Sequence, residues 1–159
     1  MSPTPSINSR FTHVNLIAQD WKRLAEFYRR VFGCTPIPPE RDLKGRWLED
    51  ATGVDDAEIH GMHLRLPGHG DEGPTLEVFQ YNIQGERPES VVNRPGFAHI
   101  AFLVDDVFAA RDVVIAAGGG TIGEVVNVDI SGVGEIAFVY VTDPEGNIIE
   151  LQQRVSGGI

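Results

Sequence analysis

The sequence contains a single cysteine, Cys34, and no apolar run near the roughly 18 residues that a membrane-spanning helix needs. One cysteine cannot form an intrachain disulfide, so a reducing compartment is expected and we predict a cytoplasmic protein. Cys34 follows the glycine that ends a helical pattern, and we interpret it as an unreactive core thiol. The N-terminus also lacks a basic segment followed by an apolar one, so neither a signal peptide nor a membrane span is predicted.

Basic residues are scarce as well, with 13 lysines and arginines against 23 aspartates and glutamates. The resulting net charge of −10 repels nucleic acids and anionic membranes, so neither is expected as a partner. A small-molecule substrate is not excluded, because a pocket can carry a local charge of its own. A chain of 159 residues is long enough for one compact domain, or for two small modules that share a core.

The first half of the chain predicts a strand, a helix and further strands. Residues 11–18 form an apolar run typical of a buried strand, after which Asp20 caps a helix that Gly33 ends. Beyond this helix we expect an irregular segment with one short strand, and then two full strands: residues 36–56 with the strand at 46–48, followed by 59–66 and 75–81.

The second half repeats this order after a polar, proline-containing connection. We expect a strand, a helix capped by Asp105 or Asp106, and three more strands: residues 97–104, 107–117, 122–128, 136–142 and 148–154. The predicted organisation is a loose N-terminal arm, two modules and a linker in one compact domain: residues 1–10, 11–81, 97–155 and, between the modules, 82–96. Neither half has enough core to be stable alone, so we expect the two to share a sheet or a barrel-like cavity.

A histidine and a glutamate recur at matching places in the two halves. Phe-Thr-His-Val, with His13, aligns with Phe-Ala-His-Ile, with His99, at an offset of 99 − 13 = 86 residues. Leu-Glu-Val-Phe-Gln, with Glu77, aligns with Ile-Glu-Leu-Gln-Gln, with Glu150, at an offset of 150 − 77 = 73. Each half therefore offers one imidazole and one carboxylate from apolar, strand-like segments, as a pseudo-symmetric metal site requires.

The two glutamates indicate a positive charge that serves both halves. Burying an unpaired carboxylate is costly, and no lysine or arginine lies in register with both Glu77 and Glu150. Two neutral imidazoles and two carboxylates around one divalent ion give a neutral ligand set that suits Zn, Ni, Co, Mn or Fe(II). The alternative is that these four side chains belong to half-buried sheets and face solvent, which strand alternation also permits.

Three motifs resemble the vicinal oxygen chelate superfamily: Leu-Glu-Val-Phe, Phe-Ala-His-Ile-Ala-Phe-Leu-Val-Asp-Asp and Asp-Pro-Glu-Gly-Asn-Ile-Ile-Glu-Leu. That group includes glyoxalase I, methylmalonyl-CoA epimerase, extradiol dioxygenases and bleomycin resistance proteins, and the resemblance runs from about residue 11 to residue 154. It implies an α+β fold in which two paired βαβββ modules form a curved, barrel-like mixed sheet around a metal site. The implied metal ligands are His13, Glu77, His99 and Glu150.

The resemblance also implies a metal-dependent lyase or isomerase of glyoxalase type. Such an enzyme stabilises an enediolate or enolate on a substrate that chelates the ion through neighbouring oxygens. Glu77 favours this proton-transfer chemistry, since epimerases tend to have glutamine there and dioxygenases use two histidines and one glutamate. We expect Glu150 to act as the catalytic base, with Glu77 as its partner on the opposite side, and Ni, Co, Zn or Mn as the ion.

Two alternatives stay open from the residues alone. One is an Fe(II)-dependent extradiol-type dioxygenase, and the other is a non-catalytic binding protein of the bleomycin resistance type. The metal site could also form within one chain or across a homodimer. His60 and His63 lie three apart in a predicted strand and so face opposite ways, and we interpret both, with His69 in a glycine-rich turn, as residues outside the metal site, although one could line the pocket.

Overall fold

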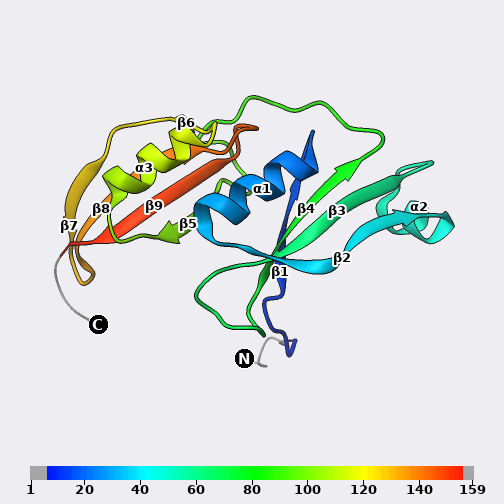
Figure 1. Cartoon of the computed structure of the whole chain (residues 1–159), viewed down its shortest axis with the longest axis horizontal. Coiled ribbons are helices and arrows are strands. Elements are labelled where there is room, and N and C mark those ends of the chain that lie inside the picture. The colour runs from blue at the N-terminus through cyan, green and yellow to red at the C-terminus, as the bar shows by residue number, and fades with distance from the viewer. Residues whose placement is uncertain (1–6, 156–159) are drawn as a thin grey trace, which may run out of the picture.

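Two separate mixed sheets, each backed by one long helix, make up the fold in the computed structural model, which describes residues 7–155 (Figure 1). Residues 1–6 of the predicted arm lie outside the described residues. The first half contains β1 (His13–Ile17), α1 (Trp21–Phe32), β2 (Thr35–Lys44), α2 (Arg46–Thr52), β3 (Glu58–Arg65) and β4 (Thr75–Tyr81). The second half contains β5 (His99–Leu103), α3 (Val107–Ala116), β6 (Gly120–Thr121), β7 (Val126–Ile130), β8 (Gly134–Thr142) and β9 (Ile148–Arg154).

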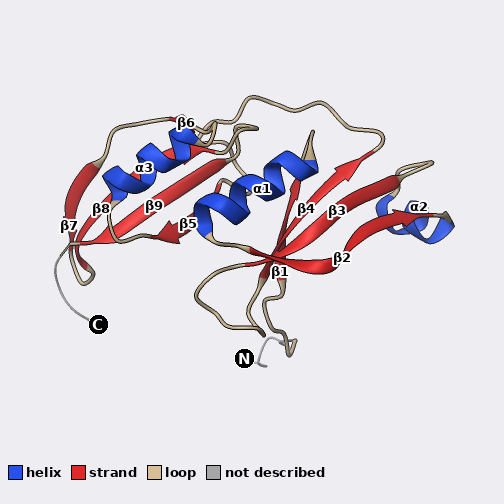
Figure 2. Ribbon diagram, viewed as in Figure 1, coloured by secondary structure: helices blue, strands red, loops and turns tan. Residues whose placement is uncertain are grey.

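The two sheets repeat one topology. The first has the strand order β1-β4-β3-β2, and the second has the order β5-β9-β8-β6, with β7 also pairing with β8. In each sheet the first strand runs parallel to the last strand of its half, and the other pairs are antiparallel. Figure 2 shows the sheets side by side along the long axis, with α1 between them in this view. The predicted α+β class with two βαβββ modules is confirmed, and the sheets stay open and curved instead of closing into a barrel.

Equivalent side chains begin the long helix of each half. Asp20 accepts a hydrogen bond from a backbone N–H of the first turn of α1, as the sequence predicted, and Asp106, one of the two candidate caps, does the same for α3. The side-chain oxygens of Gln80 and Gln153 accept the first backbone N–H of α1 and α3, respectively. Each glutamine lies three residues after the glutamate of its half, so the last strand of each sheet holds the start of its helix.

Side-chain alternation directs one face of each sheet to the helices. A single core joins both halves and includes Leu24, Phe27 and Tyr28 of α1 together with buried residues of β4, β8 and β9. The rings of Phe32 and Phe102 stack across the two halves with centroids 4.0 Å apart. The two halves therefore share a core but not a sheet, since each half forms a sheet of its own. Within residues 7–155, neither long helix covers the opposite faces, and on the first sheet the short α2 packs on Ile59 and Phe79.

A buried turn of the second half is hydrogen-bonded to α1 and to the residues just before it. Asp143 is 1% exposed and accepts hydrogen bonds from the Tyr28 hydroxyl at 2.9 Å and from the Asn147 side chain at 2.7 Å. The carboxylate of Glu145 accepts the backbone N–H groups of residues 19 and 20, just before α1. The Asp-Pro-Glu-Gly-Asn motif thus connects the two halves besides forming the turn before β9.

Two segment predictions were wrong. Residues 36–56, predicted to be irregular, form β2 and the helix α2, and the expected strand at 46–48 is the start of that helix. β2 is an edge strand, where prolines are tolerated because the missing N–H groups would face away from the sheet. The strand expected at 122–128 begins later, because residues 122–125 form no strand and β7 (Val126–Ile130) pairs with β8 across the hairpin turn. No helix within residues 7–155 is long and apolar enough to cross a membrane.

Replacing Tyr28 tests how much the buried hydrogen bond between Tyr28 and Asp143 contributes to stability. Tyr28→Phe is expected to lower the free energy of unfolding by about 1–3 kcal/mol, because the buried Asp143 loses a hydrogen-bond donor. Urea unfolding at neutral pH measures the change. Tyr81→Phe in β4 removes a hydroxyl outside this network and is the matched control. Equal stability of the two variants would contradict the role of Tyr28.

The cysteine provides a second test of the core. Cys34 is 1% exposed, and burial raises the pKa of its thiol to about 11. Because the thiolate is the reactive form, a thiol reagent at about pH 8 is expected to leave the folded protein unmodified and to label one cysteine per chain in denaturant. Rapid labelling of the folded protein, followed by absorbance, would show that the site is open to solvent.

Candidate functional site

The four predicted ligands lie on the sheet faces that the long helices leave open. His13 is on β1 and Glu77 on β4 of the first sheet, whereas His99 is on β5 and Glu150 on β9 of the second. The residues on either side of each glutamate point to the shared core, and all are buried: Leu76, Val78, Ile149 and Leu151. Strand alternation therefore requires the glutamates to face the other way.

The first half brings its predicted histidine and glutamate into contact. His13 Nε2 lies 2.9 Å from Glu77 Oε1, and the glutamate is only 9% exposed. Asn15, the neighbour of Glu77 in the parallel β1–β4 pair, donates a longer hydrogen bond of 3.5 Å to the same oxygen.

A second histidine occupies the other oxygen of Glu77. His63 lies directly opposite Glu77 in the antiparallel β3–β4 pair, and its Nε2 is 2.8 Å from Glu77 Oε2. Burial lowers the pKa of His63, and the neighbouring Arg41 and His13 lower it further against the opposing effect of the carboxylate. His63 thus contacts one of the predicted ligands, although the sequence placed it outside the metal site. His60 is half-exposed and lies 3.6 Å from Asp42.

The alternation of side chains along a strand could have indicated a histidine beside Glu77. His60 and His63 face opposite sides, so one of them had to face the same way as Glu77 once β3 paired with β4. The pairing register, which the sequence does not display, selects His63.

The second half forms an equivalent pair with different neighbours. His99 Nε2 lies 3.2 Å from Glu150 Oε2, and the Gln152 amide donates a hydrogen bond of 3.0 Å to Glu150 Oε1. Tyr140 takes the register position opposite Glu150, and its ring lies 5.2 Å from that of His99. Partial burial, with a contribution from Glu150, raises the pKa of the Tyr140 phenol. Glu150 is 8% exposed.

The chemistry of both pairs fits a divalent ion. No lysine or arginine forms an ion pair with Glu77 or Glu150 within residues 7–155, so the two buried carboxylates have only neutral or weakly basic partners. The N–O separations of 2.9 Å and 3.2 Å are those of hydrogen-bonded histidine–glutamate pairs, and each pair has the donor types of half a coordination sphere.

The chain presents these residues as two pairs and not as a set of four. Each pair belongs to a different sheet, and no group of three or more histidine, cysteine, aspartate or glutamate side chains among residues 7–155 has the arrangement to hold a metal ion. Each sheet thus contributes half of the predicted ligand set.

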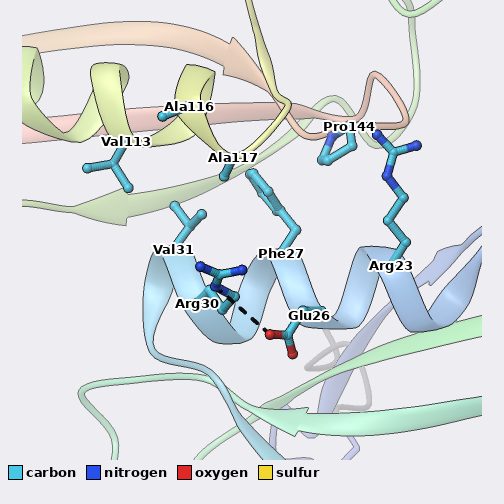
Figure 3. A pocket seen from close by; sticks show the side chains of 9 residues that line it. All are labelled: Arg23, Glu26, Phe27, Arg30, Val31, Val113, Ala116, Ala117 and Pro144. Atoms are coloured by element: carbon cyan, nitrogen blue, oxygen red, sulfur yellow. Dashed lines mark ion pairs between the residues drawn. The ribbon is translucent and has the colours of Figure 1, made fainter.

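A cleft of about 450 Å³ lies elsewhere, between α1 and α3 (Figure 3). Its lining mixes apolar and charged side chains, and in Figure 3 Arg30 approaches Glu26 across one turn of α1. The lining residues are Arg23, Glu26, Phe27, Arg30, Val31, Val113, Ala116, Ala117 and Pro144. None of the four predicted ligands is among them, so this cleft is separate from the histidine–glutamate pairs.

Known proteins resemble the chain over nearly its whole length. A family model described as the glyoxalase/bleomycin resistance protein/dioxygenase superfamily matches residues 10–151. Probable lactoylglutathione lyases of Vibrio parahaemolyticus and Vibrio cholerae are 31% and 29% identical over 147 and 150 residues, each match covering 92% of both chains. A glyoxalase family protein from Bacillus cereus has the same fold, with a TM-score of 0.73 at 17% identity, covering 98% of this chain and 99% of that one. The chain therefore belongs to the glyoxalase/bleomycin resistance protein/dioxygenase superfamily.

Proposed function

We propose that the chain is a metal-dependent lyase of glyoxalase type that acts on a thiohemiacetal able to chelate through neighbouring oxygens. The observation that carries the proposal is the repeated pair of a buried glutamate and a histidine on each open sheet face, with no lysine or arginine of residues 7–155 paired with either glutamate. The name of the two Vibrio relatives, probable lactoylglutathione lyase, supports this substrate class.

His13, Glu77, His99 and Glu150 are proposed to hold one divalent ion, with Ni, Co, Zn and Mn as the candidates. Their imidazole and carboxylate donors suit these ions. When bound, the ion would act as a Lewis acid toward the negative charge that develops on a substrate oxygen. The remaining chemistry belongs to the side chains of the chain itself.

The complete site is proposed to form between two copies of the chain. In such a homodimer, the open face of the first sheet of one protomer meets the open face of the second sheet of its partner. Large apolar side chains at and beside these faces support the arrangement, because Ile17, Phe97 and Leu103 are 47%, 108% and 64% exposed in the single chain. Pairing would bury them and would join one histidine–glutamate pair from each protomer.

Glu150 is proposed as the base that moves the proton. It would take a proton from the carbon beside the carbonyl group as the C–H electron pair shifts toward the carbonyl oxygen. It would then return that proton to the former carbonyl carbon, while the hydroxyl proton of the thiohemiacetal passes to the former carbonyl oxygen. A hydroxy thioester forms, with no net gain or loss of protons. The hydrogen bond from the neutral Gln152 amide to Oε1 keeps Glu150 oriented without neutralising its charge.

The iron-dependent dioxygenase and the non-catalytic binding protein are the competing functions. Metal analysis of protein purified without chelators separates all three. About one equivalent of Ni, Co, Zn or Mn per chain is expected, whereas iron would favour the dioxygenase. Failure to retain or take up any divalent ion would favour the binding protein.

Complementation between defective chains tests the shared site. A chain with His13→Ala and Glu77→Ala, and another with His99→Ala and Glu150→Ala, are each expected to bind no ion as homodimers. When the two chains are refolded together, one interface combines both intact halves, so about half of the wild-type metal content should return. Metal analysis of the isolated heterodimer measures this. No recovery in a heterodimer of correct mass would show that the ligands do not combine across chains.

Substitution of the proposed base tests the mechanism. Glu150→Gln is expected to lower kcat for thiohemiacetal isomerisation by about 100-fold or more, because an amide cannot accept the proton. Glu124→Gln, at an exposed position of the same half, is the charge-matched control and should keep full activity. Full turnover by Glu150→Gln, measured by absorbance of the thioester product, would remove Glu150 from the mechanism.

A further inference from the structure

His63 makes the shortest contact to Glu77. Its Nε2 is 2.8 Å from Glu77 Oε2, compared with 2.9 Å between His13 Nε2 and Glu77 Oε1. Each oxygen of the Glu77 carboxylate therefore contacts one imidazole. Only His13 has a counterpart in the second half at the same offset, so the contact of His63 is a feature of the first half alone.

The ring of His63 is held on several sides. Nδ1 lies 3.1 Å from the Thr75 hydroxyl oxygen, so both ring nitrogens have a partner. The rings of Phe79 and His13 contact it edge-on, with centroids 5.7 Å and 5.8 Å away. Phe79 reaches this place because its cross-strand neighbour is Gly61, where an added Cβ would fall 2.6 Å from the Phe79 ring.

These contacts select one tautomer of His63. An ionised Glu77 only accepts hydrogen bonds, so Nε2 carries the proton and donates it to Oε2. Nδ1 is then free to accept a hydrogen bond from the Thr75 hydroxyl. Thr75, His63 and Glu77 thus form a directed chain of hydrogen bonds that ends at Oε2 and leaves Oε1 beside His13.

The second half replaces each part of this arrangement. Tyr140 lies opposite Glu150 where His63 lies opposite Glu77, and its ring packs on His99. Gln152 stands where Phe79 stands, two residues after the glutamate, and its amide supplies the bond to Glu150. The two carboxylates are therefore chemically unequal, because an imidazole on a neighbouring strand fixes Glu77, whereas an amide on the same strand holds Glu150.

We propose that His63 is a positioning residue that fixes Glu77 through Oε2, so that Glu77 stays a metal ligand through Oε1 while Glu150 alone exchanges protons. This inference rests on the proposed function. An outer hydrogen bond of this kind orients a ligand and raises its basicity, and its loss typically weakens metal binding about 10–100-fold.

Cobalt titration of full-length variants tests the proposal. Co²⁺ affinity is measured by competition with a chromophoric chelator, and the visible d–d spectrum reports the ligand set. His63→Leu is expected to bind Co²⁺ about 10–100-fold more weakly, with an unchanged stoichiometry. His63→Gln, which keeps an N–H donor, should recover most of the affinity with the wild-type spectrum. His60→Leu, on the other face of β3, is the matched control and should bind like the wild type.

Three results would overturn the proposal. They are wild-type affinity in His63→Leu, a loss of affinity in His63→Gln as large as in His63→Leu, and a spectrum of His63→Gln that shows a missing nitrogen ligand. The last would make His63 a ligand itself.

A metal-free measurement separates this inference from the proposed function. Long-range ¹H–¹⁵N spectra of the metal-free protein should show His63 as the Nε2–H tautomer in the wild type and as a mixture in Thr75→Val. A wild-type chain that binds no Co²⁺ but shows the fixed tautomer would refute the proposed metal site and leave the Thr75–His63–Glu77 contact standing. A mixed tautomer in the wild type would refute the contact.

Discussion

A carboxylate that is buried in the middle of a sheet needs partners that offset the cost of removing its charge from water. This requirement arises once in each sheet of this protein. Glu77 and Glu150 are each flanked by core residues, so the backbone cannot turn them to solvent without exposing apolar side chains. Histidines contact both carboxylates, and an imidazole in its neutral form supplies a hydrogen bond but no positive charge. This uncompensated charge is the reason for which we propose a divalent ion at the two pairs.

The packing between the halves decides which faces of the sheets carry the histidine–glutamate pairs. The shared core, the stacked Phe32 and Phe102 rings and the Tyr28–Asp143 hydrogen bond hold the helical faces of both sheets together. Because the helices cover these faces, the histidine–glutamate pairs lie on the opposite, open ones. The same packing that stabilises one chain thus leaves its two histidine–glutamate pairs on the faces away from the long helices, as the proposed homodimer requires.

The two halves have similar histidine–glutamate pairs, but the residues around each pair differ. His63 and Tyr140 occupy equivalent register positions, as do Phe79 and Gln152, but each half distributes hydrogen-bond donors and aromatic rings in its own way. A symmetric site would treat its two glutamates alike. A proton-transfer enzyme benefits when one carboxylate is fixed and the other can exchange a proton, since the two tasks need different environments.

The sequence by itself determined the duplicated order of a strand, a helix and further strands, the Asp20 cap, and the choice between Asp105 and Asp106 for the second cap, because period and capping are local properties of the chain. It did not reveal that residues 36–56 form an edge strand and a helix, because the prolines there are compatible with a strand only at an edge. It also did not distinguish His63 from His60. The β3–β4 register places His63 beside Glu77. The packing of the halves separates the four predicted ligands into two pairs. Both depend on contacts between residues distant in the chain, which only the tertiary structure decides.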